Sequence, residues 1–193
     1  MPGDVRTRGL PLVLLLVACG GFEQESYDVV LDEADAQAVP YSCTDKTGKE
    51  DVTTTGTGGP SGLAPTQRWT VRADEFGATR LELPDVTFQN HLGEPIWFDE
   101  EAKEEDKRPD ILEGTDSSKG PFQYINIRAI PLADNTGVVT YVLRVFIDNK
   151  SLEDDTLHGT ISLRGTRDLG FGANAEEQEV CTSTVRFTGT RVR

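Results

Sequence analysis

Histidine, the side chain best suited to acid–base catalysis near neutral pH, is sparse in this chain. There are two, His91 and His158, and neither lies in a nucleophile or metalloprotease pattern such as Gly-x-Ser-x-Gly or His-Glu-x-x-His. His91 follows Asn90 near the end of an expected strand, and His158 precedes Gly159 in an expected turn. A zinc site needs three or four ligands, and the spacing of the remaining candidates supplies none. We therefore expect two surface histidines without a catalytic or zinc-binding role.

Carboxylates are abundant, with 33 aspartate and glutamate residues. Paired carboxylates hydrolyse glycosides when an apolar environment raises the pKa of one of them, but no pair is marked by apolar neighbours. Calcium takes six to eight oxygen ligands, and the loop after the longest expected strand offers Asp148, Asp154 and Asp155. These residues lack the Asp-x-Asp-x-Asp-Gly order of an EF-hand loop. We expect a solvated loop there, with no metal and no cofactor.

The N-terminus has the pattern of an export signal. Arg6 and Arg8 precede an apolar run, Leu10–Ala18, which is far shorter than the ~20 apolar residues that span a bilayer core. The run ends in Leu16-Val17-Ala18-Cys19, which resembles the lipobox of bacterial lipoproteins. The resemblance covers residues 1–20 only. The alternative is a plain secreted protein in which Cys19 stands by chance.

The lipobox resemblance has consequences for processing and location. It implies a signal peptide over residues 1–18, a diacylglyceryl group on the Cys19 sulfur, and a further acyl chain such as palmitate on the Cys19 nitrogen. Two or more acyl chains anchor a protein stably to a membrane. Gly20 stands where aspartate often marks retention in the inner membrane, so the resemblance favours the outer membrane of a bacterial cell envelope.

If Cys19 carries lipid, Cys43 and Cys181 remain as an even pair in an oxidising compartment. We predict a Cys43–Cys181 disulfide. It would close a loop over nearly the whole domain, for which chain entropy gives ~4–5 kcal/mol before strain is subtracted. Free thiols at both positions in non-reduced peptides would exclude the bond.

The net charge of −14 limits the partners. Cleavage before Cys19 removes Asp4, Arg6 and Arg8, which makes the mature chain one unit more negative. Such a chain is repelled by nucleic-acid phosphates and by anionic headgroups. The expected partners are therefore the membrane, reached through the lipid on Cys19, and an envelope protein or a glycan, but not nucleic acid.

The chain divides into a tether and a domain. Residues 19–37 are acidic and small and are expected to form a flexible tether, although Tyr27–Leu31 has the alternation of a short strand. Residues 38–193 are expected to form a β-rich globular domain, with residues 99–110 as an exposed acidic insert. In the domain, apolar residues recur with a period of two, typical of strands with one buried face. Alternate side chains of each expected strand should face the core. These are Trp69 and Val71; Ile125, Ile127 and Ala129; Val139, Tyr141, Leu143, Val145 and Ile147; and Cys181, Val185 and Phe187.

Seven to nine such strands with polar loops predict an all-β fold. We expect an antiparallel β-sandwich, with a small closed β-barrel as the alternative. Two functions fit. The first is a non-catalytic binding or structural domain on an envelope lipoprotein, and the second is an envelope hydrolase that uses paired carboxylates.

Overall fold

The computed structural model describes residues 24–38, 63–73, 78–84, 88–90, 95–99, 110–114, 119–132, 137–169 and 176–193. These residues are almost entirely antiparallel strand. In chain order the elements are β1 (Gln24–Leu31), α1 (Glu33–Ala38), β2 (Thr66–Ala73), β3 (Thr79–Leu83), β4 (Phe88–Gln89), β5 (Pro95–Ile96), β6 (Asp110–Glu113), β7 (Phe122–Pro131), β8 (Gly137–Ile147), β9 (Thr156–Leu169) and β10 (Glu176–Arg191).

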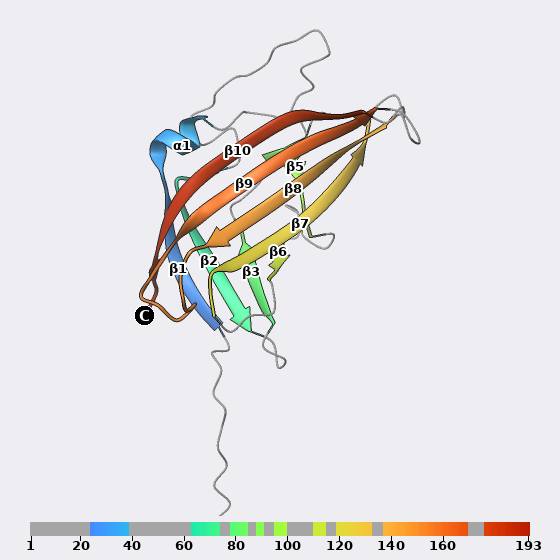
Figure 1. Ribbon diagram of the computed structural model, residues 1–193. Helices are drawn as coiled ribbons and strands as arrows, with labels where there is room; N and C mark the ends of the chain where they lie inside the picture. Colours follow the sequence, from blue (N-terminus) through green and yellow to red (C-terminus); the bar gives the residue numbers. More distant parts are fainter. Residues whose placement is uncertain are drawn as a thin grey trace, which may run out of the picture.

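Eight of the strands form one sheet in the order β6-β3-β2-β1-β10-β9-β8-β7, and β4 and β5 pair separately. The sheet curls until its two edge strands approach each other, so that it nearly closes into a barrel (Figure 1). The all-β antiparallel class predicted from the sequence is confirmed. Of the two architectures, the strand order corresponds to the barrel alternative rather than to two facing sheets.

The two edge strands are joined at the seam by a single antiparallel bridge between Gly114 and Tyr124. A Cβ atom at Gly114 would lie 2.6 Å from both the Thr79 Oγ1 and the Tyr124 Cε1, so the close approach of the strands requires glycine. The Tyr124 hydroxyl donates a hydrogen bond of 3.1 Å to the Thr79 Oγ1. Burial raises the pKa of Tyr124 to about 12, which keeps this donor protonated.

The barrel core is apolar and contains side chains from every strand of the large sheet. Trp69 on β2 and Phe187 on β10 meet edge to face inside it, with ring centroids 4.6 Å apart. The Trp69 Nε1 donates to the Gln67 Oε1 at 2.6 Å, which satisfies the one polar atom of the indole ring. Trp69 and Val71 are fully buried, as the alternation predicted.

Strand β7 corrects one expectation about which face is buried. Phe122 and Tyr124 point into the core, whereas Ile127 is 59% exposed and Ala129 is exposed. Because side chains alternate along a strand, Ile125, Ile127 and Ala129 belong to the outer face. Both faces of this strand contain apolar residues. The face with the aromatic residues Phe122 and Tyr124 is buried, because it removes the larger apolar area from water.

The predicted tether over residues 19–37 is also corrected. From Gln24 onward the chain belongs to the domain, because β1 lies between β2 and β10 in the sheet. Tyr27 and Val29 are fully buried, while the acidic residues between and after them face outward. Asp32 caps the following helix: its Oδ1 accepts the Asp35 backbone N–H at 3.0 Å. The domain therefore includes β1 and α1, which lie before residue 38, and residues 19–23 lie outside the described part.

The strands differ in length around the barrel. Strands β7–β10 contain 10, 11, 14 and 16 residues, whereas β1, β2, β3 and β6 contain 8, 8, 5 and 4. The long strands run side by side as a curved layer (Figure 1). None of the helical residues within the described ranges forms a segment long and apolar enough to cross a bilayer.

Candidate functional site

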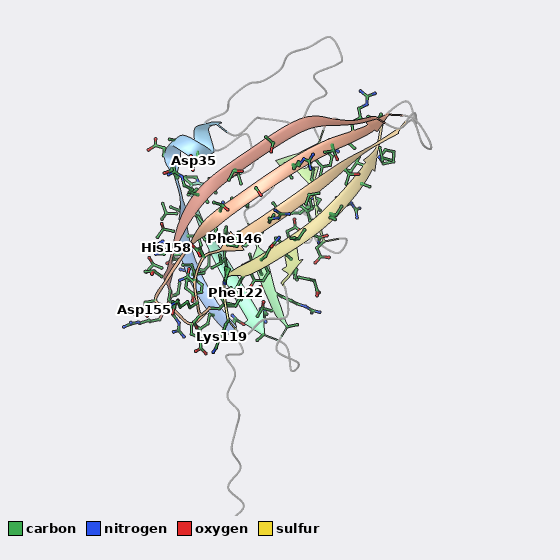
Figure 2. All side chains as sticks on the ribbon, in the orientation of Figure 1. Asp35, Lys119, Phe122, Phe146, Asp155 and His158 are labelled. Carbon is green, nitrogen blue, oxygen red and sulfur yellow. The ribbon has the colours of Figure 1, made fainter. Side chains whose placement is uncertain are left out.

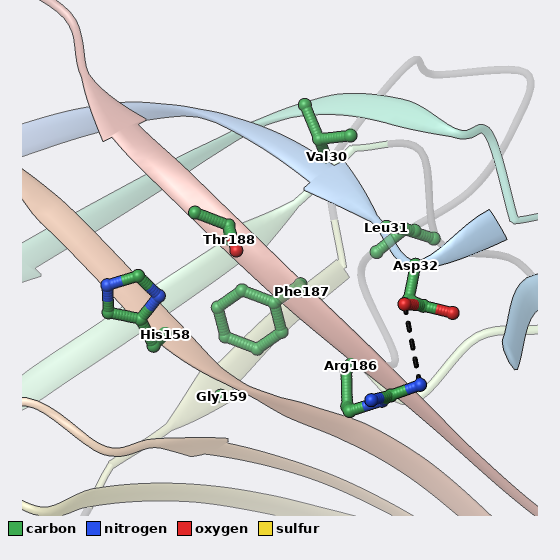
Figure 3. A pocket seen from close by; sticks show the side chains of 8 residues that line it. All are labelled: Val30, Leu31, Asp32, His158, Gly159, Arg186, Phe187 and Thr188. Carbon is green, nitrogen blue, oxygen red and sulfur yellow. Dashed lines mark ion pairs between the residues drawn. The ribbon is translucent and has the colours of Figure 1, made fainter.

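An open hollow of about 450 Å³ lies on the barrel where β1, β10 and β9 meet the start of α1 (Figure 3). Val30, Thr188 and His158 form the floor of the hollow, because they are pairing partners in one row across the three strands. The full lining is Val30, Leu31, Asp32, His158, Gly159, Arg186, Phe187 and Thr188.

One arginine is paired with two carboxylates at one wall of this hollow. The Arg186 Nε donates to the Asp35 Oδ2 at 2.6 Å. The Arg186 Nη2 also lies 3.4 Å from the Asp32 Oδ2 (Figure 3). The hydrogen bonds from Arg186 lower the pKa of Asp35 below its usual range. The pairing holds α1 against β10 and leaves the three groups with one net negative charge.

His158 lies at the other wall and corrects an expectation. It is the third residue of β9 rather than part of a turn, and its backbone N–H donates to the Asn149 Oδ1 at 2.9 Å. Its side chain is exposed on the barrel surface (Figure 2). Within the described residues, no hydrogen bond joins its imidazole to the Thr188 hydroxyl across the strand pair. His158 and Thr188 therefore do not form a hydrogen-bonded pair of base and nucleophile in the hollow.

A carboxyl group with a raised pKa lies inside the barrel, at the start of β6. Asp110 is fully buried; its Oδ2 accepts the Phe98 N–H at 3.1 Å and its Oδ1 accepts the Asp99 N–H at 2.6 Å. Burial raises the pKa of Asp110 to about 6, although these hydrogen bonds and the charge of Arg128 act in the opposite direction. Both oxygens are occupied and neither reaches solvent. Asp110 therefore fixes the chain around Phe98 rather than meeting a substrate.

Asp110 is a residue whose role the sequence reasoning missed, because it was assigned to the exposed acidic insert over residues 99–110. The signal that marks it is the alternation of Asp110-Ile111-Leu112, in which Asp110 and Leu112 share the buried face. An aspartate at such a position is read as a loop residue because carboxylates are seldom fully buried. Residues 100–109 of the insert lie outside the described part of the chain.

The three calcium candidates are placed in the loop between β8 and β9, and they do not converge. Asp155 pairs with Arg193 at 3.1 Å, the Asp154 Oδ2 accepts from the Asn149 Nδ2 at 3.1 Å, and Asp148 is exposed. Across the described ranges, no group of three or more His, Cys, Asp or Glu side chains is arranged to hold a metal.

The same loop is fixed from inside the barrel by Tyr27. Its hydroxyl donates to the Leu152 carbonyl and, at 3.0 Å, to the Asp154 carbonyl. Burial raises the pKa of Tyr27 to about 12, so the donor stays protonated. These protein hydrogen bonds account for the position of the loop.

The cysteines carry the other predicted sites. Cys19 and Cys43 lie outside the described residues. Cys181 lies on β10 opposite Gly165 of β9, just after an irregularity in the strand pairing between Glu179 and Cys181. The lipid on Cys19 and the Cys43–Cys181 disulfide therefore stay predictions, as does the surface position of His91, which also lies outside the described residues.

No protein-family model, curated protein or solved structure matches the chain. The function proposed below depends on the chain's own residues and on the lipobox resemblance.

Proposed function

We propose that this chain is a lipoprotein of a bacterial cell envelope, held in the outer membrane by lipid on Cys19, and that its barrel is a non-catalytic binding domain. The observation that carries the proposal is the sequence Leu16-Val17-Ala18-Cys19 at the end of a short apolar run. Cleavage there leaves a cysteine with two or three acyl chains, enough for stable anchoring.

The position of β1 supports the proposal. This strand begins at Gln24, five residues after Cys19, and those residues span at most about 18 Å when fully extended. The acylated cysteine would therefore keep the barrel close to the bilayer surface. The tether is shorter than the sequence suggested, since residues 24–37 belong to the domain.

The open hollow supports a binding role. Its volume lies within the ~300–1,000 Å³ of ordinary ligand sites, and it presents the apolar Val30 beside the polar side chains of Thr188 and His158. An open surface of this mixed character suits part of a glycan or of an envelope protein better than an enclosed small apolar molecule.

The alternative, an envelope hydrolase, needs two carboxyl groups with separated pKa values facing one cleft. The pKa of Asp110 is raised, and the nearby charge of Asp99 contributes to the rise. Full burial keeps Asp110 from any substrate. The geometry therefore favours binding over hydrolysis.

Metabolic labelling with palmitate tests the anchor. We expect wild-type chain to incorporate label and to pellet with membranes, and Cys19→Ser to do neither. Cys43→Ser is the matched control, since it changes a cysteine predicted to form a disulfide and should keep the label. A Cys19→Ser chain that is still cleaved at the same place and still pellets with membranes would overturn the proposal.

A further inference from the structure

The hollow at β1, β10 and β9 contains two polar side chains that the fold itself does not use. The His158 imidazole and the Thr188 hydroxyl are exposed, and neither forms a hydrogen bond within the described part of the chain. They are pairing partners on neighbouring strands, and their side chains lie close to each other (Figure 3). A neutral imidazole and a hydroxyl group can each donate and accept a hydrogen bond. This side of the hollow is therefore suited to ligand groups that also do both.

The accessible apolar surface of the hollow is small and comes from Val30. Its side chain is 54% exposed, whereas Leu31 and Phe187 in the same lining are each 4% exposed. A stable protein interface buries roughly 800 Å² on each partner around a larger apolar core. One aliphatic side chain does not provide such a core, but it can contact one face of a small ring.

The charged wall of the hollow is unfavourable for anions. Arg186 with Asp32 and Asp35 carries one net negative charge, which repels an anionic ligand. A cationic ligand would approach the guanidinium of Arg186, whose side chain is 65% exposed. The Asp32 carboxylate is 37% exposed, and its oxygens have lone pairs beyond those used by the Asp35 N–H and by Arg186. A neutral ligand with hydroxyl groups can donate to this carboxylate without an electrostatic penalty.

We propose that the hollow binds a neutral glycan chain. This inference rests on the proposed function and names the ligand class of that binding domain. A sugar ring has a face of C–H groups for Val30 and a rim of hydroxyl groups for Thr188, His158 and Asp32. Because the hollow is open, the chain of sugars can continue beyond it on the barrel surface.

The test is an NMR titration of the full-length chain carrying Cys19→Ser, in which no lipid contributes to binding. The probes are three neutral trisaccharides (maltotriose, cellotriose and the trimer of N-acetylglucosamine), anionic trigalacturonate and cationic trilysine. We expect a neutral trisaccharide to shift the ring signals of His158, with the same affinity at low and high salt. Thr188→Val, which removes one hydroxyl group, should weaken this binding about fivefold. Thr182→Val, the same change about 20 Å away along β10, should bind like wild type.

Three results would overturn the glycan proposal. The first is no shift with any of the neutral trisaccharides, and the second is equal weakening by Thr188→Val and Thr182→Val. The third is tighter binding of trigalacturonate or of trilysine, which would assign the hollow to an anionic glycan or to a basic protein segment. Such a result would reject the neutral glycan but keep the binding role of the domain.

Two controls separate these outcomes from other failures. Thr188 and Thr182 are both exposed on β10, and valine is favoured in strands, so the circular dichroism spectrum of each variant should match that of wild type. Palmitate labelling of the wild-type chain reports on Cys19 alone. Failure of glycan binding is therefore distinguishable from failure of the lipid anchor.

Discussion

The two halves of the barrel surface differ in what lies opposite their exposed arginines. On β1, β2, β3 and β6, arginines are paired with carboxylates one strand away, as in the Arg80–Glu113 pair. On β8, the exposed Arg144 lies opposite Ser162 of β9 instead of a carboxylate. Cross-strand ion pairs therefore add to the backbone ladder on the short strands.

The largest expected effect on stability comes from removing the contact between Trp69 and Phe187, which joins the two halves of the barrel. Trp69→Ala removes the fully buried indole on β2 that packs against Phe187 on β10, and it should lower the free energy of unfolding by about 3–5 kcal/mol. Urea denaturation measures the loss. Trp69→Phe, which keeps a ring at this position, should lose less. Both variants should unfold in one transition; two separate transitions would mean that the halves are independent units.

The second effect concerns the buried carboxyl group near the seam. The pKa of Asp110 is raised to about 6 in the folded barrel, above its usual 3.8. Its contribution to stability is therefore fully present below the usual value and is lost as the pH rises through about 6. A rise of about two units in the pKa corresponds to a change of about 3 kcal/mol in the free energy of unfolding.

Urea denaturation between pH 4.5 and pH 7.5 measures this contribution. The wild-type chain should lose stability as the pH rises across this range, and Asp110→Asn, which cannot ionise, should show a flatter profile. A parallel decrease in the two proteins would assign the pH dependence to other groups.

A smaller effect is expected from giving the long strands the charge pattern of the short ones. Ser162→Glu places a carboxylate opposite Arg144 and should stabilise the barrel by about 0.5 kcal/mol through a cross-strand ion pair. Urea denaturation measures the gain, and a variant no more stable than wild type would show that this ion pair does not form.

The smallest effect on stability is expected at Ile127. Because its side chain is 59% exposed, Ile127→Ser should change the free energy of unfolding by less than about 0.5 kcal/mol. Ile161→Ser, at a buried position of β9, is the comparison and should be strongly destabilising. A loss of 2 kcal/mol or more from Ile127→Ser would place this residue in the core, as its sequence pattern first suggested.

Much of the fold could be predicted from local alternation. The buried set Val139 to Ile147 on β8 was identified correctly because large apolar residues alternate there without a break. On β7 the alternation predicted the wrong face, because both faces of the strand contain apolar residues and only the packing of the sheet decides which face is buried. The same limit left sandwich and barrel unresolved, because alternation gives the buried face of each strand but not the order of the strands.

The candidate site was harder to predict. The hollow brings together Val30, Arg186 and His158, which are far apart in sequence and meet only through the pairing of β1, β10 and β9. The acidic residues of 24–37 were taken for a tether because composition outweighed the alternation of Tyr27, Val29 and Leu31. The cross-strand ion pairs of Arg68, Arg72 and Arg80 likewise depend on the strand register, which local alternation does not give.

Mass spectrometry of the mature N-terminal peptide tests the central claim most directly. In chain purified from the envelope of a bacterium that processes lipoproteins, the first residue should be Cys19, and the peptide should carry the added mass of a diacylglyceryl group, with or without a further acyl chain. A mature chain that begins at another residue, or a Cys19 without any added mass, would contradict the account.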